Sequence, residues 1–140
     1  MITIRNRFIP SRGFLALAFW PVVFVRRELY DRFGAVARRH EAIHLAQQLE
    51  VMLASLAFIG LLVISGLSPW WLCAAPTVFY VIYGIEWLVR LAVLRDRTEA
   101  YMAISFEQEA YANQRKGCYL RDRDAFAWIL YIPGGKEEKA

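Results

Sequence analysis

Charged residues are absent from two long stretches in the middle of the chain. The first runs from Val51 to Ser65 and the second from Trp70 to Ile85, with the turn-forming residues 66–69 between them. Each stretch has about 15 residues, and the flanking turns extend both toward the ~17–25 residues of a spanning helix. The pattern therefore predicts a transmembrane helical hairpin, with its second helix over residues 70–94. A buried hairpin in a soluble oligomer is the alternative.

The basic residues predict how this hairpin is oriented. The chain has 17 Lys and Arg against 13 Asp and Glu, and the turn between the two apolar stretches contains none of the basic ones. Because positive residues stay on the cytoplasmic side, we expect both termini in the cytoplasm and the turn outside. The predicted location is a cell inner (plasma) membrane, with the lipid bilayer as a partner. Without a base-reading motif, no nucleic acid partner is expected, and the oligomeric state stays open.

The N-terminal residues 1–32 show a strand-like pattern instead. Ile2–Ile9 and Phe14–Arg26 are predicted to form a small β-hairpin that turns near residues 10–13. Pro21 cannot donate to a strand ladder, so it favours an edge strand or a bulge. A re-entrant or interfacial segment is the alternative for the second of these stretches.

The length and composition predict one folded domain. The chain has 140 residues, of which 58% are hydrophobic, more than an ordinary soluble domain contains. We expect a helix over 33–65 that runs into the membrane, further helices over 98–132 and a frayed tail at 133–140. The predicted fold class is mainly α and integral membrane: a two-helix transmembrane hairpin inserted in a minimal metal-binding helical domain with a small N-terminal β-hairpin.

The two histidines of the chain, His40 and His44, lie four residues apart in the first predicted helix. This spacing stacks both imidazoles on one helix face, where they can bind one metal ion. Glu41 adjoins the first histidine, where a carboxylate can take a proton from water bound to the metal. The motif predicts a zinc site about two turns outside the bilayer, at its cytoplasmic surface. A solvated helix face without metal is the alternative.

A third ligand must be a carboxylate, because a catalytic zinc site usually has three protein ligands and no third histidine exists. The candidates are Glu50, Glu86, Glu99, Glu107 and Glu109. Glu50 lies at the wrong angle on the histidine helix, and Glu86 is placed to pair with Arg90. Asn113 shares a helix face with Glu109, from where an amide can orient a ligand histidine.

The string His40-Glu41-x-x-His44, followed by Glu109-x-x-x-Asn113, resembles the two signatures of gluzincin zinc metallopeptidases. Asn113 stands where that family has Asp. The hairpin between the signatures is similar to that of integral-membrane gluzincins, which include the HtpX and CAAX-prenyl proteases and the sensor-transducer peptidases of β-lactam resistance. The longer strings around both motifs also resemble a family of small bacterial membrane proteins, over most of the chain.

This resemblance implies a zinc (Zn2+) cofactor and assigns roles around it. The implied metal ligands are His40, His44 and Glu109, with Glu41 as general base. The resemblance also implies that the strand ahead of the active helix pairs with an extended polypeptide substrate, which gives the substrate-binding residues Phe19, Val22, Val23 and Phe24. Tyr119, which follows the predicted Glu109 helix, is the best-placed candidate to stabilise an oxyanion.

These observations predict a membrane-embedded zinc metallopeptidase that hydrolyses peptide bonds at the cytoplasmic membrane face. One alternative is a non-catalytic membrane protein with a structural or sensory zinc site. Another is a membrane scaffold or interaction protein in which the motif is accidental. Glu41 separates the first two functions, because a purely structural metal site has no need of a general base.

Overall fold

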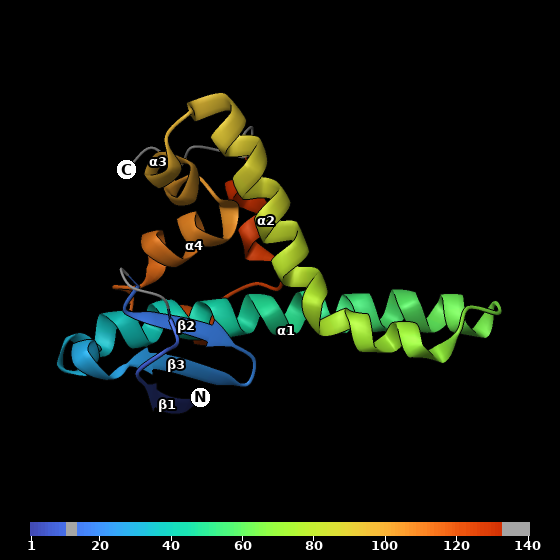
Figure 1. The fold of residues 1–140 in the computed structure, drawn as a ribbon, viewed down its shortest axis with the longest axis horizontal. Helices are drawn as coiled ribbons and strands as arrows, with labels where there is room; N and C mark the ends of the chain where they lie inside the picture. Colours follow the sequence, from blue (N-terminus) through green and yellow to red (C-terminus); the bar gives the residue numbers. More distant parts are fainter. Residues whose placement is uncertain (11–13, 133–140) are drawn as a thin grey trace.

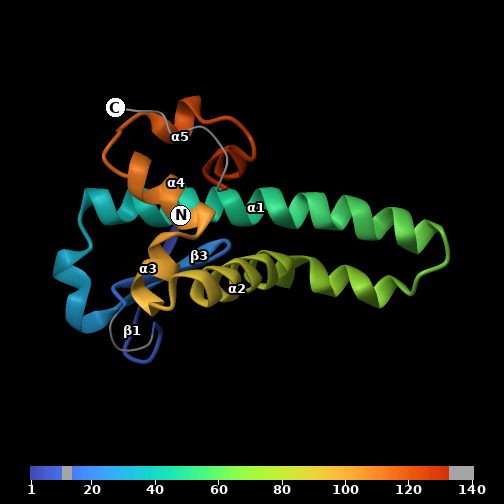
Figure 2. The ribbon, with the colours of Figure 1, turned by 90° about the horizontal axis from the view of Figure 1, so that it is seen from above.

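The chain forms a long helical hairpin, a small sheet beside its base and a group of short helices where the hairpin opens (Figures 1 and 2). The computed structural model describes residues 1–10 and 14–132. The tail predicted at 133–140 and most of the turn predicted at 10–13 lie outside the described residues. The described part is mainly helical, as the sequence predicts.

The first leg of the hairpin is α1 (Ala35–Ile64), one uninterrupted helix of 30 residues. It contains no proline, and it carries the two histidines in its first half and the apolar stretch in its second. The helix is followed by Gly66, whose positive φ of 109° is a conformation that glycine adopts without strain. The prediction of a single helix over both segments is confirmed.

The return leg consists of a 3-10 turn, η2 (Pro69–Ala74), and α2 (Ala75–Leu94). Pro69 and Pro76 both lie in first turns, where a missing N–H leaves no helix bond unmade. Near the tip α2 packs along α1, and further on it diverges from α1 (Figure 1). Two of the described helical segments, Ala35–Ile64 and Pro69–Leu94, are long and apolar enough to cross a membrane.

Short helices follow the hairpin. They are α3 (Arg97–Met102), α4 (Ser105–Asn113), α5 (Tyr119–Asp122) and the 3-10 helix η3 (Ala127–Tyr131). Of these, α3 packs against α2, α4 against α1 and η3 against α4. The predicted ion pair between Glu86 and Arg90 is present, at 3.1 Å. Glu86 also accepts hydrogen bonds from the backbone N and the Oγ of Ser105, at 2.9 and 2.7 Å. These bonds attach the start of α4 to α2.

The sheet has three strands, β1 (Ile2–Asn6), β2 (Ala16–Phe19) and β3 (Val22–Arg26), in the order β1-β3-β2. This order corrects the predicted hairpin. The second predicted strand folds back on itself at Trp20 and Pro21 to form the antiparallel β2–β3 pair, and β1 pairs in parallel with β3. Val23 and Val25 are fully buried, so the most apolar strand takes the central place, while Pro21 stays outside the ladder.

The edge strand β2 is attached to both legs of the hairpin, first through the side chain of Gln48 on α1. Its Nε2 donates to the carbonyl of Ala18 at 3.0 Å, and its Oε1 accepts from the N–H of Trp20 at 2.8 Å. The hydroxyl of Tyr80 on α2 donates to the same Ala18 carbonyl at 3.2 Å. Both legs of the hairpin therefore hold β2 in place. A 3-10 helix, η1 (Arg27–Arg32), connects the sheet to α1.

Candidate metal centre

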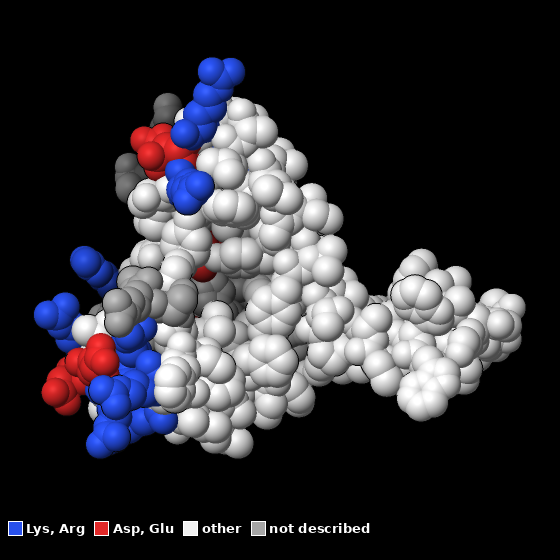
Figure 3. All heavy atoms as spheres, viewed as in Figure 1, with Lys and Arg blue, Asp and Glu red and all other residues white. Residues whose placement is uncertain are grey.

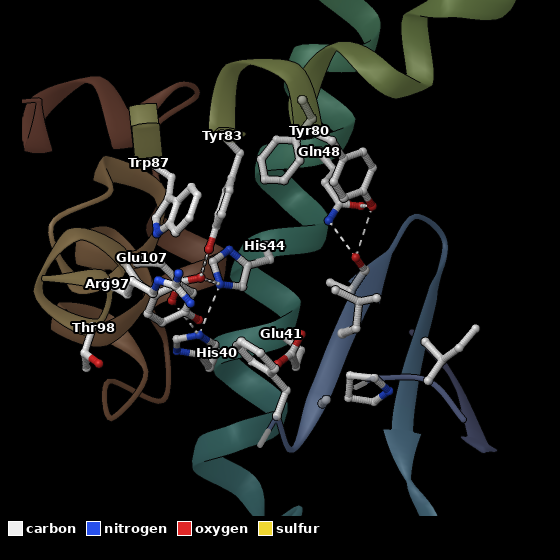
Figure 4. A pocket seen from close by; sticks show the side chains of 18 of the residues that line it. His40, Glu41, His44, Gln48, Tyr80, Tyr83, Trp87, Arg97, Thr98 and Glu107 are labelled. Atoms are coloured by element: carbon white, nitrogen blue, oxygen red, sulfur yellow. Dashed lines mark hydrogen bonds and ion pairs between the residues drawn. The ribbon is translucent and has the colours of Figure 1, made fainter. Parts of the chain in front are cut away.

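Three side chains from two elements converge between the legs of the hairpin: His40 and His44 from α1, and Glu107 from α4 (Figure 4). One ligand atom of each lies within 4.8 Å of the others. The two Nε2 atoms are 3.1 Å apart, and the Glu107 carboxylate lies 3.3 Å from Nε2 of His40 and 3.2 Å from that of His44. We call these three residues the metal cluster. All of them are buried.

The position of Glu107 follows from the way α4 begins. Ser105 is held by Glu86, and the buried side chains of Ile104 and Phe106 pack into the core with Phe79. Glu107, in the first turn of α4, then faces α1 at the level of the histidines. The hydroxyl of Tyr83 donates to its Oε1 at 2.8 Å.

The structure brings Glu107, and not the predicted Glu109, to the two histidines. Two residues along a helix are about 200° apart around its axis, so Glu107 and Glu109 point to different sides of α4. The carboxylate of Glu109 accepts from Nε2 of Gln47 at 3.0 Å and from the hydroxyl of Tyr119 at 2.9 Å. It also forms an ion pair with Arg123. Glu109 is thus already bound by other side chains and does not join the histidines.

Gln47 links Glu109 to the metal cluster and fixes the proton on one histidine. Its Oε1 lies 2.8 Å from Nδ1 of His44, while its Nε2 donates to Glu109 and to the carbonyl of Phe106, both at 3.0 Å. Those two partners can only accept, so the NH₂ group must face them and Oε1 must face the imidazole. Nδ1 of His44 therefore carries a proton, which leaves Nε2 as the ring nitrogen that faces the metal cluster.

Asn113 and Tyr119 do not have the places predicted for them. The Asn113 amide donates to the carbonyl of Glu109 and to the hydroxyl of Tyr131, both at 2.9 Å, so it orients no histidine. Gln47 has that role instead. The Tyr119 hydroxyl is held by Glu109, and burial and that carboxylate raise the pKa of Tyr119 above its usual value. Tyr119 is thus a protonated donor to Glu109, and it is not among the cavity residues.

The carboxyl of Glu107 has the protonation state and the free capacity that a metal ligand needs. Burial disfavours its charge, but the imidazoles of His44 and His40 outweigh burial and hold the pKa of Glu107 well below its usual range. Among the described residues, Oε2 of Glu107 and Nδ1 of His40 have no hydrogen-bond partner. Two imidazoles and a carboxylate are a donor set that zinc accepts, so the residues fit a zinc ion.

A cavity of about 820 Å³ adjoins the metal cluster, with Glu41 in its wall (Figure 4). Its other walls come from β2, from α3 and from aromatic side chains of α2. The lining residues include Ala16, Leu17 and Ala18 of β2, and Tyr80, Tyr83 and Trp87 of α2. The motif residues therefore face an open, mainly apolar cleft that has room for a ligand.

The predicted substrate strand needs a correction as well. Val22, Val23 and Phe24 belong to β3, which is paired on both sides and can accept no further strand. Among the described strands next to the cavity, β2 has the unpaired edge. Phe19 lies on β2, where its ring stacks on Tyr80 at 5.7 Å between centroids. The free edge therefore belongs to β2, and of the four predicted substrate-binding residues only Phe19 lies on that strand.

A buried ion network that the sequence does not predict lies behind the metal cluster. Arg123 contacts Glu109 and Glu50, with Nη2 at 3.1 Å from the first carboxylate and 3.2 Å from the second. Its side chain is 4% exposed. The only sequence signal is the Glu50 and Arg123 charges themselves, which are 73 residues apart. The network holds Glu109, and through it Gln47, in position.

We expect detergent-purified protein to contain about one zinc ion per chain, as for a site with three protein ligands. Alanine at His40, His44 or Glu107 should reduce the zinc content to near zero, because each removes one donor. Zinc content is measured by mass spectrometry of the metal. Glu99→Ala, which removes an exposed carboxylate from α3, is the control and should keep the ion. Zinc that persists in His44→Ala would contradict this ligand set.

Gln47→Ala should weaken zinc binding by roughly 10–100-fold, the usual effect of losing a partner that orients a ligand histidine. The dissociation constant is measured by competition with a chelator. Gln108→Ala, at an exposed position of α4, is the matched control and should leave it unchanged. Equal affinities for the two folded variants would show that Gln47 does not orient His44.

Comparison with known proteins assigns no family to this chain. No family model matches it, and no curated protein or solved structure matches it significantly.

Proposed function

We propose that this protein is a membrane-embedded zinc metallopeptidase that hydrolyses polypeptides at the cytoplasmic face of the membrane. One observation carries the proposal. The buried metal cluster lies beside Glu41 in the wall of a cavity that is also bordered by an unpaired strand edge. Ligands, a general base and a surface for an extended chain are the parts that peptide hydrolysis needs.

Each of these residues has a task that its position supports. His40, His44 and Glu107 would hold the zinc ion, which would polarise a scissile carbonyl and lower the pKa of a water molecule. Glu41 would accept a proton from the attacking water as the water oxygen bonds to the carbonyl carbon, and would return a proton to the nitrogen as the C–N bond breaks. Gln47 keeps Nε2 of His44 directed at the cluster.

The edge of β2 supplies the surface for an extended substrate. The Ala18 carbonyl points away from β3, since it accepts from Gln48 and Tyr80. Residues two apart in a strand face the same way, so the backbone groups of Ala16 also point to the free edge, at the cavity. An extended peptide can add to β2 there by main-chain hydrogen bonds.

The proposed location is the inner membrane, with the hairpin crossing the bilayer and both termini in the cytoplasm. Charged side chains gather at the end of the molecule away from the hairpin tip, and the tip shows none in Figure 3. Trp70 and Trp71 are exposed at that tip, where tryptophans favour the membrane interface. This distribution supports insertion tip first from the cytoplasmic side.

Glu41→Gln should retain its zinc but lose peptidase activity by about 10²–10⁴-fold, the contribution of a general base. Activity is measured as cleavage of a library of quenched fluorescent peptides by detergent-purified protein, with Glu99→Gln as the matched control. Equal cleavage by Glu41→Gln and wild type would remove Glu41 from catalysis. Zinc in wild type without cleavage of any peptide would favour a structural or sensory metal site.

Single cysteines test the orientation. Ser68→Cys, in the Cys73→Ser background, places a thiol at the exposed tip of the hairpin, and Cys118 is exposed after α4. In spheroplasts, a membrane-impermeant maleimide should label Ser68→Cys, and should label Cys118 only after permeabilisation. Cys118→Ser, alone and with Ser68→Cys, identifies which residue carries the label. Labelling of Cys118 alone before permeabilisation would invert the topology, and labelling of both would exclude a spanning hairpin.

A further inference from the structure

We infer that the sheet and α2 also contact lipid, and that the metal cluster lies at the depth of the inner boundary of the hydrocarbon core. This inference rests on the proposed insertion of the hairpin. It differs from the expectation that the motif stands about two turns outside the bilayer. The partner is the acyl region of the inner leaflet, and the contacting surface is the β2–β3 turn together with the outward face of α2.

The part of the hairpin that projects beyond the sheet is too short to cross a bilayer. Phe19 and Trp20, at the β2–β3 turn, border a small cavity together with Met52 of α1 and Pro76 of α2, which marks the level that the sheet reaches. Beyond Met52, α1 has about 12 residues, or roughly 18 Å at 1.5 Å per residue. The hydrocarbon core is ~30 Å thick. The remaining depth must be occupied by the part of the protein that surrounds the site.

The same rise per residue gives the depth of the metal cluster in the bilayer. About 20 residues separate His44 from Ile64 at the tip, which corresponds to roughly 30 Å of helix. When the tip reaches the outer boundary of the core, His44 is therefore at the inner boundary. An inclined α1 would bring the histidines still deeper.

The exposed surface at this additional depth is apolar. Phe19 is 49% and Trp20 41% exposed at the β2–β3 turn. The outward face of α2 exposes Val81, Ile85, Leu88 and Val89. In Figure 3 this face of α2 continues the uncharged surface of the hairpin, and the visible charges begin beyond it. Lipid explains why so much apolar surface lies next to the hairpin without a partner in the chain.

The charged residues at this depth are paired rather than exposed to lipid. Glu50 is bound by Arg123, whose side chain is buried, and Glu86 is bound by Arg90. Paired charges that face the protein interior are the kind that membrane proteins tolerate. An apolar segment of a polypeptide could therefore reach the cavity without leaving the bilayer.

Nitroxide labels on single cysteines test this inference. The background is Cys73→Ser with Cys118→Ser, and the labelled sites are Trp20→Cys at the sheet, Phe58→Cys on the hairpin and Arg32→Cys in η1. The protein is reconstituted in phosphatidylcholine vesicles, and spin relaxation by oxygen, which concentrates in hydrocarbon, is compared with relaxation by a water-soluble nickel chelate. Oxygen should dominate at Phe58 and Trp20, and the nickel chelate at Arg32.

The outcomes separate the inference from the proposed function. Oxygen at Phe58 with the nickel chelate at Trp20 would overturn the inference and leave the inserted hairpin intact. Dominant relaxation by the nickel chelate at both Phe58 and Trp20 would overturn this inference and also the proposed insertion of the hairpin. Leu88→Cys, on the outward face of α2, gives an independent reading if Trp20→Cys disturbs the turn, and it should follow Phe58 in the same way.

Discussion

The burial of the Glu107 carboxylate against two imidazoles is the interaction on which the centre of this structure depends. A buried charge is costly unless it is paired, and here one tyrosine hydroxyl and the two histidines compensate it. That compensation requires α4 to approach α1 closely, which the bonds between Glu86 and Ser105 secure from the side of α2. Because α2 diverges from α1 to reach α4, the cavity beside the metal cluster follows from the same arrangement.

The continuous α1 helix joins this centre to the apolar hairpin. His44, Gln47 and Glu50 lie on successive turns of it, and each is held by a residue from after the hairpin: Glu107, Glu109 and Arg123. The segment after the hairpin is thus attached to α1 by three polar contacts in a row. These contacts fix the orientation of the metal cluster relative to α1.

Local patterns in the sequence were enough to predict the helices, the hairpin and the pairing of the two histidines. The Glu86–Arg90 pair was predictable too, because its geometry is set within one helix. Which carboxylate joins the histidines was not predictable, because Glu107 and Glu109 lie in the same short helix. Only the packing of α4 against α1 determines which of the two faces the histidines. Likewise, the order of the strands depends on the burial of β3, and the Glu50–Arg123 pair joins positions far apart in the chain.

The glutamates near the hairpin can be sorted by the partner that each one meets. Each of three glutamates contacts an arginine that compensates its charge: Glu50, Glu86 and Glu109. These carboxylates therefore have a structural role. Glu107 forms no ion pair with an arginine in the described part of the chain, and its carboxylate lies against the hydroxyl of Tyr83 and the two imidazoles. The histidines and the tyrosine hydroxyl offset its charge, and a divalent cation bound between these groups would offset it further in a dry interior. This difference in partners favours Glu107 over the other three glutamates as the carboxylate that would bind a metal ion.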